Sequence, residues 1–165
     1  VQSRKKYFCF FICHGVSPLS VFNFIYDNIN KDKNSKKYEV LYMFADTHNH
    51  TCHYSPDAEQ TIDELIAAAV SNNLSVVGIT EHYEYDNPDP EDNIQTFDID
   101  SYIKSFEDWK KKCPSSLELL MGIEFGYQTH TASVIDELAA KYPFDTVVLS
   151  NHLFRGVDLF YSKDA

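Results

Sequence analysis

The chain has 165 residues and a mass of 19.0 kDa, enough for one domain with a hydrophobic core. Hydrophobic residues make up 44% and charged residues 24% of the sequence, which excludes a disordered or fibrous protein. The net charge of -11 argues against recognition of a long nucleic-acid duplex through a basic surface. The 4 cysteines form no CxxC motif, which is typical of a reduced, cytoplasmic protein.

The first 42 residues differ in composition from the rest of the chain. They contain no methionine, are rich in Phe, Ile, Tyr, Asn and Lys, and carry more basic than acidic side chains. We expect residues 1–42 to be a leader or extension outside the domain, with Met43 as the natural start. A signal peptide, or an extension that packs on the domain, is the alternative. The apolar run at residues 7–13 is too short for a membrane span, which needs ~20 residues.

From Met43 onward, short apolar runs alternate with amphipathic segments. Strands are predicted at residues 43–45, 76–80, 117–123 and 144–149. Helices are predicted at residues 62–72, 98–112 and 133–141. Thr61 and Glu64 have the spacing of a capping box at the start of the first helix. Continuous apolar strands are typical of a parallel sheet buried on both faces, so the alternating order predicts an α/β domain.

Side chains that can bind metals follow each predicted strand. They are Asp46, His48 and His50, then Glu81 and His82, then Glu124, and finally His152. The carboxyl ends of parallel strands lie at one edge of a sheet, where active sites assemble. Imidazoles and carboxylates without thiolates suit Zn, Mn or Fe, and a cluster wider than four ligands predicts two or three divalent ions. Glu124 is the best candidate for a carboxylate that bridges two ions.

Four motifs occur in order: ADTHNHT at residues 45–51 with YSPDA at 54–58, GITEH at 78–82, GIE at 122–124 and LSNH at 149–152. They resemble the motifs of the PHP (polymerase and histidinol phosphatase) domain family. Within that family, the chain is most similar to the stand-alone histidinol-phosphatases. The resemblance covers residues 43–165. It implies a distorted (β/α)7 TIM-like barrel with parallel strands and up to three metal ions.

The resemblance also implies an activity and a set of ligands. The activity is hydrolysis of a small phosphomonoester, histidinol phosphate in the best-known branch, by metal-activated water and without a protein nucleophile. Asp46 would hold a ligand imidazole in place. The ligands carried over are His48, His50 and Glu124 for one ion, Glu124 and His152 for a second, and Asp57 and His82 for a third. Glu124 and His152 are also the candidate catalytic residues, together with Arg155, which would pair with the substrate phosphate.

Two features depart from the family pattern. Glu81 stands where the family usually has Asp, and the chain stops at Ala165, before the family's later histidine and Asp-x-His motif. A complete barrel needs ~200–250 residues. We therefore expect residues 43–165 to form the N-terminal part of the barrel, incomplete at its C-terminal end. Membrane binding is not expected, and the sequence does not predict the oligomeric state.

Several alternatives remain open at this level. The chain is a phosphatase for L-histidinol phosphate, a related phosphoesterase acting on nucleotides or oligonucleotides, or an inactive truncated metal-binding fragment. Arg155 has a surface role as its alternative. His53 is expected to make a structural hydrogen bond rather than touch a metal or substrate. Glu84 either lines the substrate cleft or packs in a loop.

Overall fold

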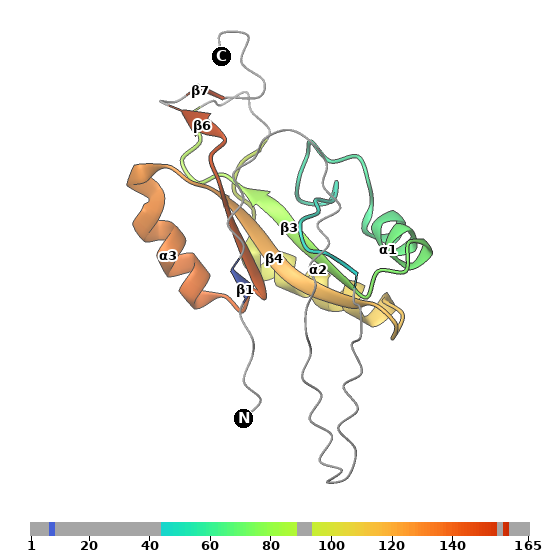
Figure 1. Ribbon diagram of the computed structural model, residues 1–165. Helices are drawn as coiled ribbons and strands as arrows, with labels where there is room; N and C mark the ends of the chain where they lie inside the picture. Colours follow the sequence, from blue (N-terminus) through green and yellow to red (C-terminus); the bar gives the residue numbers. More distant parts are fainter. Residues whose placement is uncertain (1–6, 9–43, 89–93, 155–156, 159–165) are drawn as a thin grey trace, which may run out of the picture.

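The computed structural model describes residues 7–8, 44–88, 94–154 and 157–158. Its main feature is a parallel sheet with the strand order β1-β5-β4-β3-β2 (Figure 1). The strands of this sheet are β1 (Tyr7–Phe8), β2 (Ala45–Asp46), β3 (Val76–Tyr83), β4 (Glu118–Gly126) and β5 (Thr146–Ser150). A separate antiparallel pair follows, formed by β6 (Leu153–Phe154) and β7 (Val157–Asp158). The predicted α/β class with parallel strands is confirmed.

The helices form where the sequence predicts them. They are α1 (Ile62–Ser71), α2 (Ile99–Lys112) and α3 (Ala132–Lys141), with a short 3-10 helix η1 (Thr129–Thr131) before α3. The capping box at the start of α1 is present, because Glu64 N–H donates to the Thr61 hydroxyl and Thr61 N–H donates to the Glu64 carboxylate. Asp98 caps α2 by accepting from the backbone N–H of Asp100.

The two central strands are longer than predicted. Glu81 and His82 lie inside β3, and Glu124 lies inside β4, so the prediction that they follow these strands is wrong. The apolar run stops at the first polar residue in the sequence, but the backbone ladder continues, with His82 opposite Glu124. A buried polar side chain can stay in a strand when it finds polar partners, and these three residues do.

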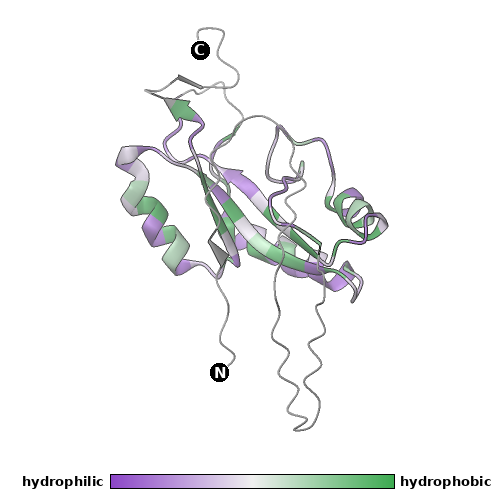
Figure 2. Ribbon diagram, viewed as in Figure 1, coloured by the Kyte–Doolittle hydropathy of each residue, from purple (hydrophilic) through white to green (hydrophobic). Residues whose placement is uncertain are grey.

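The alternation of side chains divides β3 and β4 into two faces. Odd-numbered residues such as Ile79 and Ile123 join the main core with Leu65 of α1, Tyr102 and Trp109 of α2. Even-numbered residues lie on the opposite face, which carries Gly78, Thr80 and His82 of β3 and Gly122, Glu124 and Gly126 of β4. In Figure 2 the helices carry both hydrophilic and hydrophobic segments, and β3 turns hydrophilic toward its end. Helix packing and polar chemistry therefore use opposite faces of the same strands.

Part of the first 42 residues contacts the sheet. Tyr7 and Phe8 form β1, which pairs in parallel with β5 at Thr146 and Val147. Residues 1–6 and 9–43 lie outside the described residues. This range includes Met43, so the predicted domain boundary at residue 43 stays a prediction. In the part of the chain that the structure describes, none of the helices is both long enough and apolar enough to cross a membrane.

Candidate metal site

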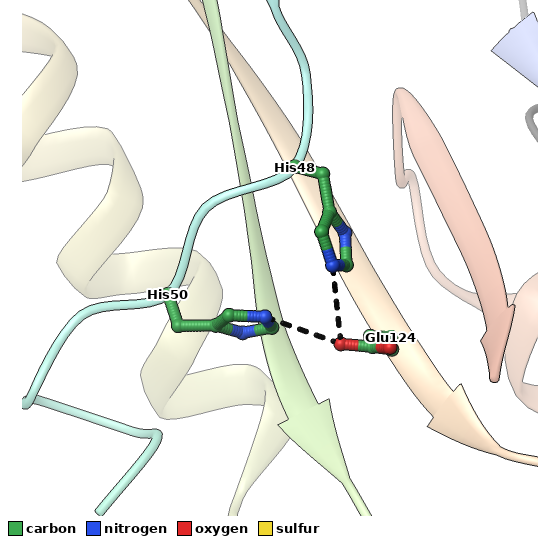
Figure 3. Close-up of side chains that lie close together, drawn as sticks. All are labelled: His48, His50 and Glu124. Carbon is green, nitrogen blue, oxygen red and sulfur yellow. Dashed lines mark ion pairs between the residues drawn. The ribbon is translucent and has the colours of Figure 1, made fainter. Parts of the chain in front are cut away.

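The buried carboxylate of Glu124 lies close to four imidazoles. Glu124 Oε2 lies 3.7 Å from His48 Nε2, 3.3 Å from His50 Nε2 and 3.1 Å from His82 Nδ1, and Glu124 Oε1 lies 3.3 Å from His152 Nε2. The Glu124 side chain is 2% exposed. Figure 3 shows His48 and His50 pointing from one segment toward Glu124. The structure thus brings together the side chains that the four motifs supply.

The segment after β2 lies against the face of β3 that carries Gly78, Thr80 and His82. Thr80 N–H donates to the Asn49 carbonyl at 2.8 Å, and Asn49 Nδ2 donates to the Gly78 carbonyl at 3.2 Å. A β-carbon at Gly78 would lie 2.6 Å from the Thr47 carbonyl oxygen, so only glycine allows this approach. With Asn49 turned to the strand, His48 and His50 point the same way, as their spacing predicts.

Hydrogen bonds fix the two imidazole-bearing residues of this segment. His48 Nδ1 lies 3.0 Å from Thr80 Oγ1, which leaves Nε2 toward Glu124. The His50 carbonyl accepts from Gln60 Nε2 at 3.0 Å. Asp46 Oδ1 accepts from the backbone N–H of His48 at 3.4 Å. The Thr80 hydroxyl thus contacts the His48 imidazole, while Asp46 contacts the backbone of His48, and the role of Asp46 toward an imidazole stays a prediction.

The later part of the same connection carries Asp57 to the cluster, and Glu81 anchors it. The Glu81 carboxylate accepts from Thr51 N–H at 3.0 Å, from the Thr51 hydroxyl at 2.5 Å and from the Ser55 hydroxyl at 2.6 Å. Ser55 Oγ in turn accepts from His82 N–H at 3.0 Å. Asp57 Oδ2 then lies 3.4 Å from His82 Nε2. The Glu81 carboxylate therefore supports the loop and makes none of the contacts with Glu124.

The charges of these groups depend on one another. Burial would raise the pKa of Glu124, but the hydrogen bond with His152 and the nearby imidazoles lower it to about 2. Burial would lower the pKa of His152, but the hydrogen bonds with Glu124 and Glu84 raise it to about 10. Burial and the neighbouring His82 lower the pKa of His50 to about 4. Without bound ions, the cluster therefore holds an ionised Glu124, a protonated His152 and a neutral His50 at pH 7.

The donor set fits divalent metal ions. Two groups bring ligand atoms within 4.8 Å of one another, namely His48, His50 and Glu124, and His82, Glu124 and His152. Glu124 Oε2 and His82 Nδ1 face each other, yet neither has a hydrogen-bond partner within the described residues. Buried polar atoms without partners are costly, and a cation between them would satisfy both. Imidazole and carboxylate ligands suit Zn, Mn and Fe alike.

Other candidate residues lie away from the cluster or outside the described part. Arg155 is outside the described residues, so its predicted role is untested. His53 is exposed and packs its ring against Trp109, with centroids 5.3 Å apart. His130 is exposed and pairs with Asp86 at 2.9 Å.

Glu84 is the residue that sequence reasoning undervalued. Its buried carboxylate contacts His152 Nδ1 at 2.5 Å, on the side of the ring opposite Glu124. A signal for this placement exists in the sequence. Thr80, His82 and Glu84 are spaced by two, so Glu84 continues the row of side chains that faces the cluster.

Comparisons with known proteins agree with this arrangement. Residues 46–165 match the model of the PHP domain family. A probable histidinol-phosphatase of Clostridium acetobutylicum is 35% identical over 72% of this chain and 43% of its own length. The histidinol-phosphatase of Lactococcus lactis is 22% identical over 70% of this chain and 41% of its own length. The chain therefore spans about two fifths of the length of the curated relatives it matches.

A solved structure has the same fold. The crystal structure of histidinol phosphate phosphatase from Lactococcus lactis, complexed with zinc, L-histidinol and phosphate, superimposes with a TM-score of 0.61 at 21% identity. The match covers 69% of this chain and 42% of that chain. The predicted fold class, part of a TIM-like barrel, is confirmed.

Proposed function

The chain belongs to the PHP domain family, and from this membership we propose that it provides the metal-binding part of a phosphomonoesterase. The proposed reaction is the hydrolysis of L-histidinol phosphate to L-histidinol and phosphate, a step of histidine biosynthesis. The names of both curated relatives support this substrate, as does the L-histidinol and phosphate bound in the related crystal structure.

The observation that carries the proposal is the position of Glu124 among four imidazoles. A carboxylate with both oxygens used in this way has the chemistry of a bridge between two cations. Asp57 and Glu84 add negative charge beside it. An anionic phosphate would be repelled by such a site, so cations are needed before the site can accept this substrate.

We propose the following assignment of ligands. His48, His50 and Glu124 would hold one ion, Glu124 and His152 a second, and Asp57 and His82 a third. Such ions, when bound, supply positive charge for the phosphate and acidify water. The protein's part is to hold Glu124 where both groups of ligands can share it, and to orient the His48 imidazole through Thr80.

Three further expectations belong to this proposal. Arg155 would bind the substrate phosphate from the segment after His152. Residues 43–165 would form the family portion of the protein, and residues 1–42 a leader or extension. The protein would act in the cytoplasm, on a small phosphorylated molecule, with two or three ions of Zn, Mn or Fe.

The test combines metal content with phosphate release. The 165-residue chain is reconstituted with Zn²⁺ or Mn²⁺, and phosphate release from L-histidinol phosphate is compared with that from a dinucleotide. We expect metal-dependent turnover of L-histidinol phosphate that is lost when His48 and Glu124 are both replaced by Ala. Glu118→Gln, an exposed position at the start of β4, is the matched control and should retain turnover.

Three outcomes would contradict parts of the proposal. Faster hydrolysis of the dinucleotide would favour the related phosphoesterase. Metal binding without any turnover would favour the inactive metal-binding fragment. Retained activity in the double variant would overturn the assignment of the ligands.

A further inference from the structure

His152 is held between two buried carboxylates. Its Nε2 lies 3.3 Å from Glu124 Oε1, and its Nδ1 lies 2.5 Å from Glu84 Oε1. The side chains of Glu84 and Glu124 are 3% and 2% exposed, and that of His152 is 15% exposed. Glu84 belongs to neither of the two groups of ligand atoms that could hold an ion. Its contact is with the nitrogen of His152 that faces away from Glu124.

Gly126 provides the space for the Glu84 carboxylate. A β-carbon at residue 126 would lie 1.7 Å from Glu84 Oε2 and 2.1 Å from Oε1. The carboxylate thus lies where any other side chain of this residue would begin. Gly126 is also the register partner of Ser150 on β5, two residues before His152. The end of β4 therefore brings Glu84 and His152 into reach of each other.

An imidazole that binds a metal through one nitrogen commonly donates the N–H of the other to a carboxylate. Such a contact selects the tautomer with a free lone pair on the metal side and holds the ring in place. Glu84 has the required position, burial and chemistry. Its second oxygen, Oε2, has no hydrogen-bond partner among the described residues.

We propose that Glu84 is a positioning residue, which accepts a hydrogen bond from His152 Nδ1 and directs His152 Nε2 toward the ion shared with Glu124. The inference rests on the proposed metal site. It adds a residue that acts through His152 and does not itself hold the ion. Gly126 is part of the same arrangement, because its lack of a side chain leaves space for the Glu84 carboxylate.

The test measures zinc binding rather than turnover. Zinc affinity and stoichiometry of the full 165-residue chain are determined by competition with a chromophoric chelator. Glu84→Ala removes the acceptor, whereas Gly126→Ala keeps Glu84 and displaces its carboxylate. We expect both variants to bind zinc about 10–100-fold more weakly at the His152 site, with unchanged stoichiometry at saturation. Glu84→Gln retains an acceptor oxygen, so we expect it to recover most of the affinity, and Glu118→Gln should match the wild type.

The imidazole itself gives a second readout. Nitrogen-15 NMR of the zinc-loaded wild type should show His152 with its proton on Nδ1, and Glu84→Ala should lose this uniform state. Loss of one zinc ion at saturation would mean that Glu84 is a ligand, which overturns the positioning role. Wild-type affinity in both Glu84→Ala and Gly126→Ala would overturn it as well. If the wild-type chain binds no zinc, the proposed function fails together with this inference.

Discussion

His82 and Glu124 are register partners on the neighbouring strands β3 and β4, and His82 Nδ1 lies 3.1 Å from Glu124 Oε2. Both side chains leave their strands on the same face, because register partners in a parallel pair point the same way. The two groups are thus positioned by the backbone hydrogen bonds of the sheet. His48, His50 and His152 reach this fixed pair from connecting segments.

Replacing Glu124 should reduce metal binding more than replacing any one histidine does. In Glu124→Gln the carboxylate that contacts four imidazoles is lost, so we expect the bound metal to fall for both groups together. Because loss of a residue that merely supports a ligand costs about 10–100-fold, turnover should fall by more than ~100-fold. Elemental analysis of the metal-to-protein ratio checks this. Loss of one ion with retention of the others would contradict a shared carboxylate.

Metal binding should release protons. The pKa of His152 is raised to about 10, so its imidazole carries a proton at pH 7 in the metal-free protein. Burial would lower the pKa of His82, but the hydrogen bond with Asp57 and the nearby Glu124 raise it above its ordinary value. An ion binds only the unprotonated form, and apparent affinity should therefore rise with pH, by about tenfold per pH unit for each displaced proton. His50 contributes no proton, because burial and the neighbouring His82 lower its pKa to about 4.

Titration calorimetry in buffers of different ionisation enthalpy measures this release. We expect the observed binding enthalpy to change with the buffer, and the slope to give the number of protons. An enthalpy that is independent of the buffer at pH 7 would contradict the prediction.

Glu81 should matter for stability rather than for metal binding alone. In Glu81→Ala the buried groups of Thr51 and Ser55 lose their acceptor, which costs about 1–3 kcal/mol of unfolding free energy. Glu81→Gln can still accept from Thr51 N–H and should cost less. Urea unfolding of the metal-free protein checks both, with Glu59→Ala, an exposed position in the same loop, as the control. An equal effect of Glu81→Ala and Glu59→Ala would refute the anchoring role.

Tyr102 should affect the fold and leave the site intact. Its buried hydroxyl donates to the carbonyls of Ile79 at 3.2 Å and Gly122 at 2.9 Å, and so joins α2 to β3 and β4. Tyr102→Phe removes these bonds at almost constant volume, so we expect a loss of about 0.5–1.5 kcal/mol without a change in metal content. The exposed Tyr127→Phe is the matched control. Reduced metal content in Tyr102→Phe would show that the two faces are coupled.

The sequence predicts most of the fold because each element has a local cause. The helices begin where Thr61 and Asp98 can cap them, and the strands contain continuous apolar runs. The candidate ligands are predictable for a similar reason, since the spacing of His48 and His50 and their positions at strand ends are local features. Their convergence on Glu124 could be expected only from the general geometry of parallel sheets.

The contacts that the sequence does not reveal join residues that are far apart along the chain and close only in the folded structure. Glu84 reaches His152 because Gly126, 42 positions away, has no side chain. Glu81 lies next to His82 but points to Thr51 and Ser55, which are 30 and 26 residues distant. The pairing of Tyr7 and Phe8 with β5 is equally nonlocal. The spacing along the chain indicates which face Glu84 shares with His82, but it does not indicate which distant residue Glu84 reaches.

The two-faced character of β3 also limits how the chain can change in length. Removing one residue between Val76 and Thr80 would turn the rest of the strand over, so that Ile79 and Tyr83 would face the imidazoles and His82 would enter the helix-covered core. A substitution changes one side chain on one face, whereas a shift of one position exchanges the two faces. Insertions and deletions are therefore confined to connections such as the one between Lys112 and Glu118, where no alternation has to be kept.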